Sequence, residues 1–334
     1  MTASIQKLSV ELGCYFRCFL LLTVCLASLR CAHASRGMCM YASLDRSGGR
    51  WRIPERCTHL YLTQINFGSV GARQMGQALS ANPPVTRVDS SSCQIKGFSG
   101  AAALGDSLKV NTVLQQWDLG NNALGDNGAE AIAQGLAVNT ALRWLNLAHN
   151  RIGPAGAEAL ASALRQNKVL TSLNLDSNRI HDDGLEYLAN MLRENSVLET
   201  LILSGNQINN EGAAILAEAL PHNQGLKTLH IKYNRISAEG ARRLAEAVVN
   251  RRQLTVIGPI PLEYGIARHK LKQEAWASKN ATLMMEVARM YEDGVRGAEK
   301  LTDRFIQAYC WCVPLIPGPH VCPSCETARW YLLP

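Results

Sequence analysis

Four cysteines near the C-terminal end have a spacing that could support metal or redox chemistry. Cys310 and Cys312 form a C-x-C pair, nine residues follow, and Cys322 and Cys325 form a C-x-x-C pair. Four thiolates can hold a zinc ion in tetrahedral geometry, and two disulfides are equally natural in an oxidising compartment. Because one pair is C-x-C and the loop between the pairs holds three prolines, we favour disulfides or an unstructured tail. We expect no bound metal.

Motifs of catalysis are missing from the sequence. It contains no G-x-x-x-x-G-K-[ST], no H-E-x-x-H and no G-x-S-x-G, and GFSGA (97–101) is only a near miss for the last of these. The acidic stretch HDDG (181–184) lies in the same place as GDNG (125–128) and NNEG (209–212). Asp and Asn at such turns start helices. We therefore expect neither an enzyme nor a cofactor.

Charge does not favour a nucleic-acid partner. The 334 residues carry a formal net charge of +7, and the basic residues occur only in short groups such as Arg242-Arg243 and Arg251-Arg252. A nucleic-acid binder usually concentrates lysine and arginine in one stripe. We therefore expect ordinary solvated charge and no nucleic acid.

The N-terminal 34 residues have the order of a secretory signal peptide. Lys7 and Arg17 precede an apolar stretch (18–29), and the small residues Ala32 and Ala34 follow it. The apolar stretch is shorter than the roughly 20 residues that a membrane span needs, so we expect cleavage near Ala34, no span in the mature chain, and a location in the secretory pathway or outside the cell. Asn280 begins an N-glycosylation sequon that would then be used. If the segment is not a functional signal, the chain is cytoplasmic.

The elements that organise the rest of the chain come from one repeated unit. The pattern L-x-x-L-x-L-x-x-N-x-ϕ recurs, and its asparagines are spaced by 28 residues: Asn122, Asn150, Asn178, Asn206 and Asn234. VTRVDSSSCQI (85–95) fits with Cys93 in the asparagine position, CTHLYLTQINF (57–67) fits loosely, and LTVIGPI (254–260) begins a unit that ends at two prolines. We therefore predict seven to eight repeats over residues 57–258.

Each repeat is predicted to be a short strand, a turn and a helix. Alternation in L-x-L sends the leucines inward, and segments such as GAEALASAL (156–164) have the apolar spacing of a helix with one buried face. Asparagine can bond backbone groups in a turn, so a buried ladder of asparagines is expected. Trp117 lies in a leucine position and is expected in the core.

These repeats resemble those of leucine-rich repeat proteins of the ribonuclease-inhibitor subtype, which also occur in NOD-like receptors. The resemblance implies an α/β solenoid shaped like a horseshoe, with parallel strands on the concave face and helices on the convex face. It also implies protein binding rather than catalysis.

The positions between the repeated leucines point out of the strands and are the predicted partner-binding surface. Trp144 is the strongest candidate, because tryptophan is enriched at binding hot spots. The alternative is that it packs over Gln116 and Arg143 or beneath a terminal segment. The candidate residues on this concave face are Arg143, Trp144, Asn146, His149, Asn174, Ile202, Lys227, His230, Lys232 and Tyr233.

Segments outside the repeats complete the predicted organisation. Residues 35–56 form an N-terminal flank, residues 259–309 a helical extension that caps the last repeat or docks a partner, and residues 310–334 the tail rich in cysteine and proline. The function predicted is a non-catalytic protein-interaction module. The alternatives are a regulator of an enzyme, similar to ribonuclease inhibitor or to a GTPase-activating protein, and a fragment of an innate-immune receptor or adaptor.

Overall fold

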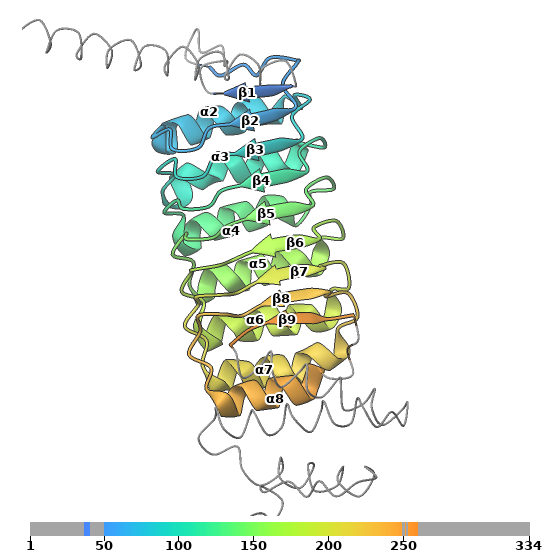
Figure 1. Ribbon diagram of the computed structural model, residues 1–334. Coiled ribbons are helices and arrows are strands. Elements are labelled where there is room, and N and C mark those ends of the chain that lie inside the picture. The colour runs from blue at the N-terminus through green and yellow to red at the C-terminus, as the bar shows by residue number, and fades with distance from the viewer. Residues whose placement is uncertain (1–36, 41–49, 249–250, 252, 260–334) are drawn as a thin grey trace, which may run out of the picture.

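A computed structural model describes residues 37–40, 50–248, 251 and 253–259 of the chain. Over these residues the predicted α/β solenoid is confirmed: one parallel sheet forms one face, and helices cover the other (Figure 1). The signal-like segment (1–34), the helical extension from residue 260, Asn280 and the four tail cysteines lie outside the described residues.

Strand order follows chain order throughout the described part, because each unit stacks on the one before it. The strands are β1 (Met38–Met40), β2 (His59–Tyr61), β3 (Arg87–Asp89), β4 (Gln116–Asp118), β5 (Trp144–Asn146), β6 (Ser172–Asn174), β7 (Thr200–Ile202), β8 (Thr228–His230) and β9 (Thr255–Ile257). The helices are α2 (Gly68–Ser80), α3 (Gly97–Val110), α4 (Gly125–Leu136), α5 (Pro154–Gln166), α6 (His181–Glu194), α7 (Asn210–Ala219) and α8 (Ala238–Val248), with a 3-10 turn η3 (Leu220–His222) after α7.

The core lies between the sheet and the helices. The middle residue of each strand from β2 to β9 points into it and is buried, as are the apolar faces of the helices. Trp117 is fully buried in its leucine position, as predicted, and its indole N–H donates to Ser90 Oγ at 3.1 Å. Burial of the inward leucines therefore explains why they recur in each unit.

The predicted asparagine ladder is present, and all its members are buried except Asn234, which is half-buried. Asn178 Nδ2 donates to the carbonyl oxygens of Leu147 and Leu175, both at 3.0 Å. Its Oδ1 accepts the backbone N–H groups of Asn150 and Ile152 in the preceding unit, both at 3.0 Å. Cys93 takes the asparagine position in its own unit, and its thiol donates to the Leu62 carbonyl at 3.0 Å.

A second asparagine ladder, which we did not predict, follows the helices. Asn167 Nδ2 donates to the carbonyls of Leu136 at 2.7 Å and Asn139 at 3.0 Å, while its Oδ1 accepts two backbone N–H groups of its own turn. In the last unit, Arg251 takes this place and donates to Leu220 O at 2.6 Å. The equivalent buried asparagines are Asn111, Asn139, Asn195 and Asn223.

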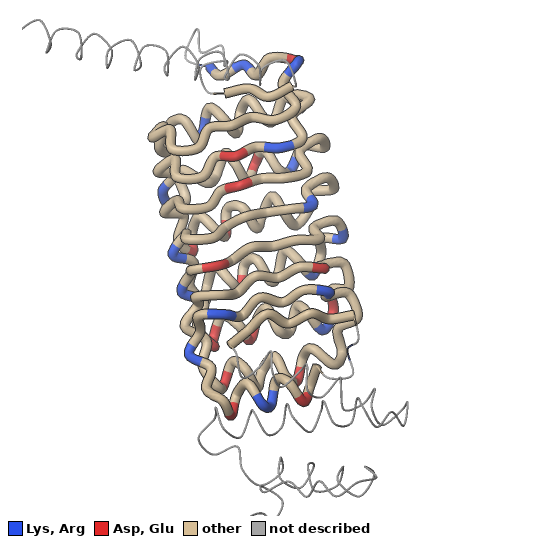
Figure 2. Tube along the Cα trace, in the orientation of Figure 1, with Lys and Arg blue, Asp and Glu red and all other residues tan. Residues whose placement is uncertain are grey.

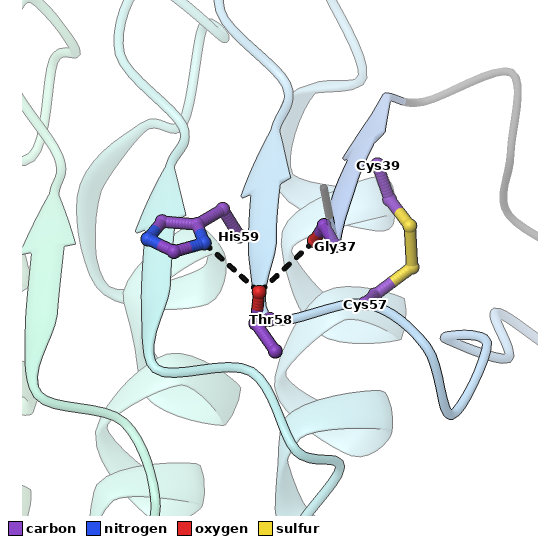
Figure 3. Close-up of a disulfide and its surroundings, with 5 residues drawn as sticks. All are labelled: Gly37, Cys39, Cys57, Thr58 and His59. Carbon is purple, nitrogen blue, oxygen red and sulfur yellow. Dashed lines mark hydrogen bonds between the residues drawn. A yellow bond between two sulfur atoms is a disulfide. The ribbon is translucent and has the colours of Figure 1, made fainter. Parts of the chain in front are cut away.

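The N-terminal end has an additional strand and a disulfide. β1 lies in the flank, for which the repeat pattern predicts no strand, and pairs with β2 in parallel. Figure 3 shows the Cys39–Cys57 disulfide that joins β1 to the start of the first unit, with Cα atoms 5.6 Å apart. Beside it, Thr58 Oγ1 donates to Gly37 O at 3.2 Å. This end of the sheet is therefore covalently held.

Candidate functional site

The candidate surface is formed by the outward side chains of the first and third residues of strands β2 to β9, which we call the strand face. Parallel pairing aligns these positions from unit to unit. Trp144 lies between Gln116 and Ser172 in the first row, and Asn146 lies between Asp118 and Asn174 in the third row. The predicted residues of β5 to β8 therefore share one face.

Trp144 is half-buried on this face, whereas its neighbour Arg143 is exposed. Sheet register sets Gln116 on one side of the tryptophan and the smaller Ser172 on the other. An outward tryptophan on a strand keeps a large apolar surface available to a partner. Trp144 thus stays the strongest predicted contact.

Asn146 and Asn174 have a structural role that the sequence analysis did not assign to them. Asn146 Oδ1 accepts the backbone N–H of Ala148 at 2.9 Å, and Asn174 Oδ1 accepts that of Asp176 at 2.9 Å. Each side chain thereby closes the turn that follows its strand. Asn146 Nδ2 also donates to Asp118 Oδ1 at 2.9 Å.

Two carboxylates, which the site prediction omitted, lie side by side in the third row. Asp89 and Asp118 are Cα partners on β3 and β4, and both are half-buried. Burial raises the pKa of Asp118, hydrogen bonds from Gly120 and Asn146 lower it, and the charge of Asp89 raises it further. Sheet register makes Asp89 and Asp118 neighbours, and Figure 2 shows acidic positions on adjacent strands of the sheet. The adjacency of Asp89 and Asp118 depends on the register between their strands, so no local sequence motif predicts it.

His149 and Tyr233 occupy a strained backbone position just before the ladder asparagine. Both have φ of 55°, in the left-handed region, where the other units place residues such as Asn121 or Gly205. A left-handed conformation is unusual for a bulky side chain. His149 Nε2 lies 3.7 Å from Asp176 Oδ2, and Tyr233 is 88% exposed.

The last strands make the strand face less polar. Ile202, His230 and Ile257 are Cα partners in the third row and are half-buried. Lys227 Nζ lies 2.6 Å from Glu199 Oε1, so the lysine charge already has an ion-pair partner within the fold. Lys232, in the turn after β8, is half-buried. Ile257 extends the predicted surface by one strand.

The acidic stretch at 181–184 caps a helix, as predicted, but the helix is that of the next unit. Asp182 Oδ1 accepts the backbone N–H groups of Asn209 and Gly212 at the start of α7, both at 3.0 Å. Asp126 does the same for α5. Within the described ranges no group of three or more histidine, cysteine or acidic side chains is arranged to hold a metal ion. No helix in this part of the chain is long and apolar enough to cross a membrane.

Comparisons with known proteins bear on the repeats. A family model for leucine-rich repeats matches residues 110–133, 138–161, 166–189, 194–217 and 222–245. A search of curated proteins finds no match.

Three solved structures with a similar fold are each less than 25% identical in sequence to this chain. Actin-binding site 2 of leiomodin-1 is 21% identical with a TM-score of 0.36, over 61% of this chain and 94% of that one. An internalin from Listeria monocytogenes is 22% identical with a TM-score of 0.37, over 62% of this chain and 48% of that one. The C-terminal domain of tropomodulin from Caenorhabditis elegans is 16% identical with a TM-score of 0.36, over 51% of this chain and 96% of that one.

Sheet, helices, ladders and family matches agree on one architecture. Residues 110–245 contain five segments that match the leucine-rich repeat model, and the described part of the chain has the fold of an α/β leucine-rich repeat solenoid.

Proposed function

We propose that this chain is a non-catalytic module that binds a protein partner through its strand face. One observation carries the proposal: inward positions are occupied by repeated leucines and asparagines, whereas the outward strand positions change from unit to unit and include the half-buried Trp144. The turn that follows β8 adds the 88% exposed Tyr233. Aromatic side chains of this kind dominate the energy of protein interfaces. Leucine-rich repeats in residues 110–245 support a protein-interaction role in general.

We also propose that the repeats are of the ribonuclease-inhibitor subtype. Strands β4 to β8 begin at 28-residue intervals, and each is followed by a helix of 10 to 14 residues. Such full helices fit the resemblance that the repeat motif suggests.

The experiment is affinity capture with the purified full-length chain, followed by calorimetry with the protein that is captured. Trp144→Ala is compared with Tyr187→Ala, which removes an exposed aromatic ring from α6 on the helix face. Trp144→Ala should weaken binding by about thirtyfold, the loss typical of a hot spot, and Tyr187→Ala should leave the Kd unchanged. Equal effects of the two variants, at unchanged Tm, would show that the strand face is not the binding surface.

For location, we propose the secretory pathway. The Cys39–Cys57 disulfide supports it, because disulfides persist in oxidising compartments, and the signal-like N-terminus agrees. Sequencing the N-terminus of the expressed protein is the test. An intact N-terminus and an unglycosylated Asn280 would favour the cytoplasm.

A further inference from the structure

The negative charges of Asp89 and Asp118 are not needed by the fold. In β3 to β6, the third strand residue accepts the backbone N–H of the residue two positions later, at 3.1 Å for Asp89, 2.8 Å for Asp118, and 2.9 Å for both Asn146 and Asn174. In β5 and β6 the acceptor of this hydrogen bond is the neutral side-chain amide of an asparagine. The turn therefore requires the oxygen but not the charge.

A negative charge on Asp118, beside Asp89, is unfavourable for the folded protein. The two carboxylates are register neighbours, and no lysine, arginine or histidine nitrogen of the described residues lies within 4.0 Å of either one. Arg87 lies on the same face two residues before Asp89, and its charge lowers the pKa of Asp118, but it is exposed and forms no ion pair within 4.0 Å of either carboxylate. Partial burial and the neighbouring charge of Asp89 disfavour the ionised form of Asp118. An external cation would relieve this cost.

Trp144 lies one strand beyond this pair. It is one strand and two residues away from Asp118, which places their Cα atoms about 8 Å apart for a strand spacing of about 4.8 Å and a rise of about 3.3 Å per residue. A carboxylate pair beside an indole suits a lysine or arginine side chain, since the acids match the charge and the ring contacts the cation or its stem.

The other end of the strand face suits an apolar group. Ile202 and Ile257 flank His230 in the third row, and Tyr233 projects into solvent from its left-handed backbone position. From β4 to β8 the face extends over four strand spacings, about 19 Å. An extended chain covers that distance in about six residues.

We propose that the strand face binds an extended segment of a partner protein, with an arginine or lysine side chain over Asp89 and Asp118. An apolar side chain about six residues along the same segment contacts Ile202 and Ile257, on either side of His230. This inference rests on the proposed function and specifies the chemistry of the partner.

Selection from a library of random displayed peptides tests the inference without knowledge of the partner. The full-length chain is the bait, in parallel with an Asp89→Asn/Asp118→Asn double variant, which keeps both turn acceptors. Arg87→Gln is the matched control, because it changes one charge on the same face. Peptides selected on the wild type should be rich in arginine or lysine with an apolar residue about six positions away. They should bind the double variant about tenfold more weakly or worse, and Arg87→Gln as tightly or more tightly.

Each outcome bears on one proposal. Peptides that lose binding to Trp144→Ala but contain no excess of basic residues, or that bind the double variant equally well, would overturn the inference and leave the proposed function standing. Selected peptides that bind Trp144→Ala unchanged, or a library from which none is enriched, would count against the strand face as a binding surface. A rise in Tm on adding calcium chloride that the double variant lacks would assign the two carboxylates to a metal ion and overturn the inference.

Discussion

Replacing Asn178 by alanine should cost far more stability than replacing Asn146, although both are asparagines of neighbouring repeats. Asn178 is 4% exposed, and its Oδ1 accepts two buried backbone N–H groups, those of Asn150 and Ile152, at 3.0 Å each. Each buried donor left without an acceptor costs about 1–3 kcal/mol. We therefore expect Asn178→Ala to lower the free energy of unfolding by about 4 kcal/mol.

Asn146→Ala leaves only one backbone donor without its acceptor, the N–H of Ala148, and also removes the half-buried hydrogen bond from Asn146 Nδ2 to Asp118 Oδ1. The expected loss is about 1 kcal/mol. Urea unfolding followed by circular dichroism measures both values, and equal m-values would show that the same surface is exposed in each variant. The division of the repeat into buried ladder and variable surface would be refuted if the two losses were equal, or if Asn146→Ala were the more damaging.

Two further predictions concern titratable groups. Asp118→Asn should be at least as stable as the wild type at neutral pH, because burial raises the pKa of the Asp118 carboxyl and ionisation therefore costs more in the folded state. The cost of ionising Asp118 grows as pH rises through the folded pKa and is absent below the unfolded pKa of about 3.9. The stability advantage of Asp118→Asn, measured by urea unfolding, should therefore disappear near pH 3. An Asp118→Asn protein less stable than the wild type at pH 7 would contradict this prediction. Burial raises the pKa of the Cys93 thiol to about 11, so at about pH 8 only about one thiol in a thousand is ionised. Peptide mapping after iodoacetamide treatment should find Cys93 unmodified in the native protein and modified in urea, whereas rapid reaction of the native protein would show that its position in the ladder is open to solvent.

Much of the scaffold could be predicted from local spacing. The inward leucines, the 28-residue series from Asn122 to Asn234, Cys93 as an asparagine substitute and the buried Trp117 all follow from position within one repeat. A residue's distance from the next leucine tells whether it points toward the helix or away from it. Burial was therefore predictable even where the residue type departed from the pattern.

The candidate site was predicted only in part. The outward rows containing Trp144 and Ile202 follow from alternation, but alternation does not reveal which outward side chains also bond their own turn, as Asn146 and Asn174 do. Nor does it reveal Asp89 beside Asp118, because their adjacency requires the register between two strands 29 residues apart in the chain.

The sequence alone therefore determined the repeating unit, since a leucine or an asparagine at a set position faces the same surroundings in every unit. Tertiary structure alone decided the contacts between units. The asparagines that follow the helices bond carbonyls up to 32 residues earlier, Asp126 and Asp182 cap the helix of the next unit, and Cys39 closes the first edge of the sheet onto Cys57. These partners are distant in sequence and meet only when the units stack. The repeat pattern of the sequence indicates whether a side chain is buried, whereas the stacking of units decides which group it hydrogen-bonds and which charged residue lies beside it.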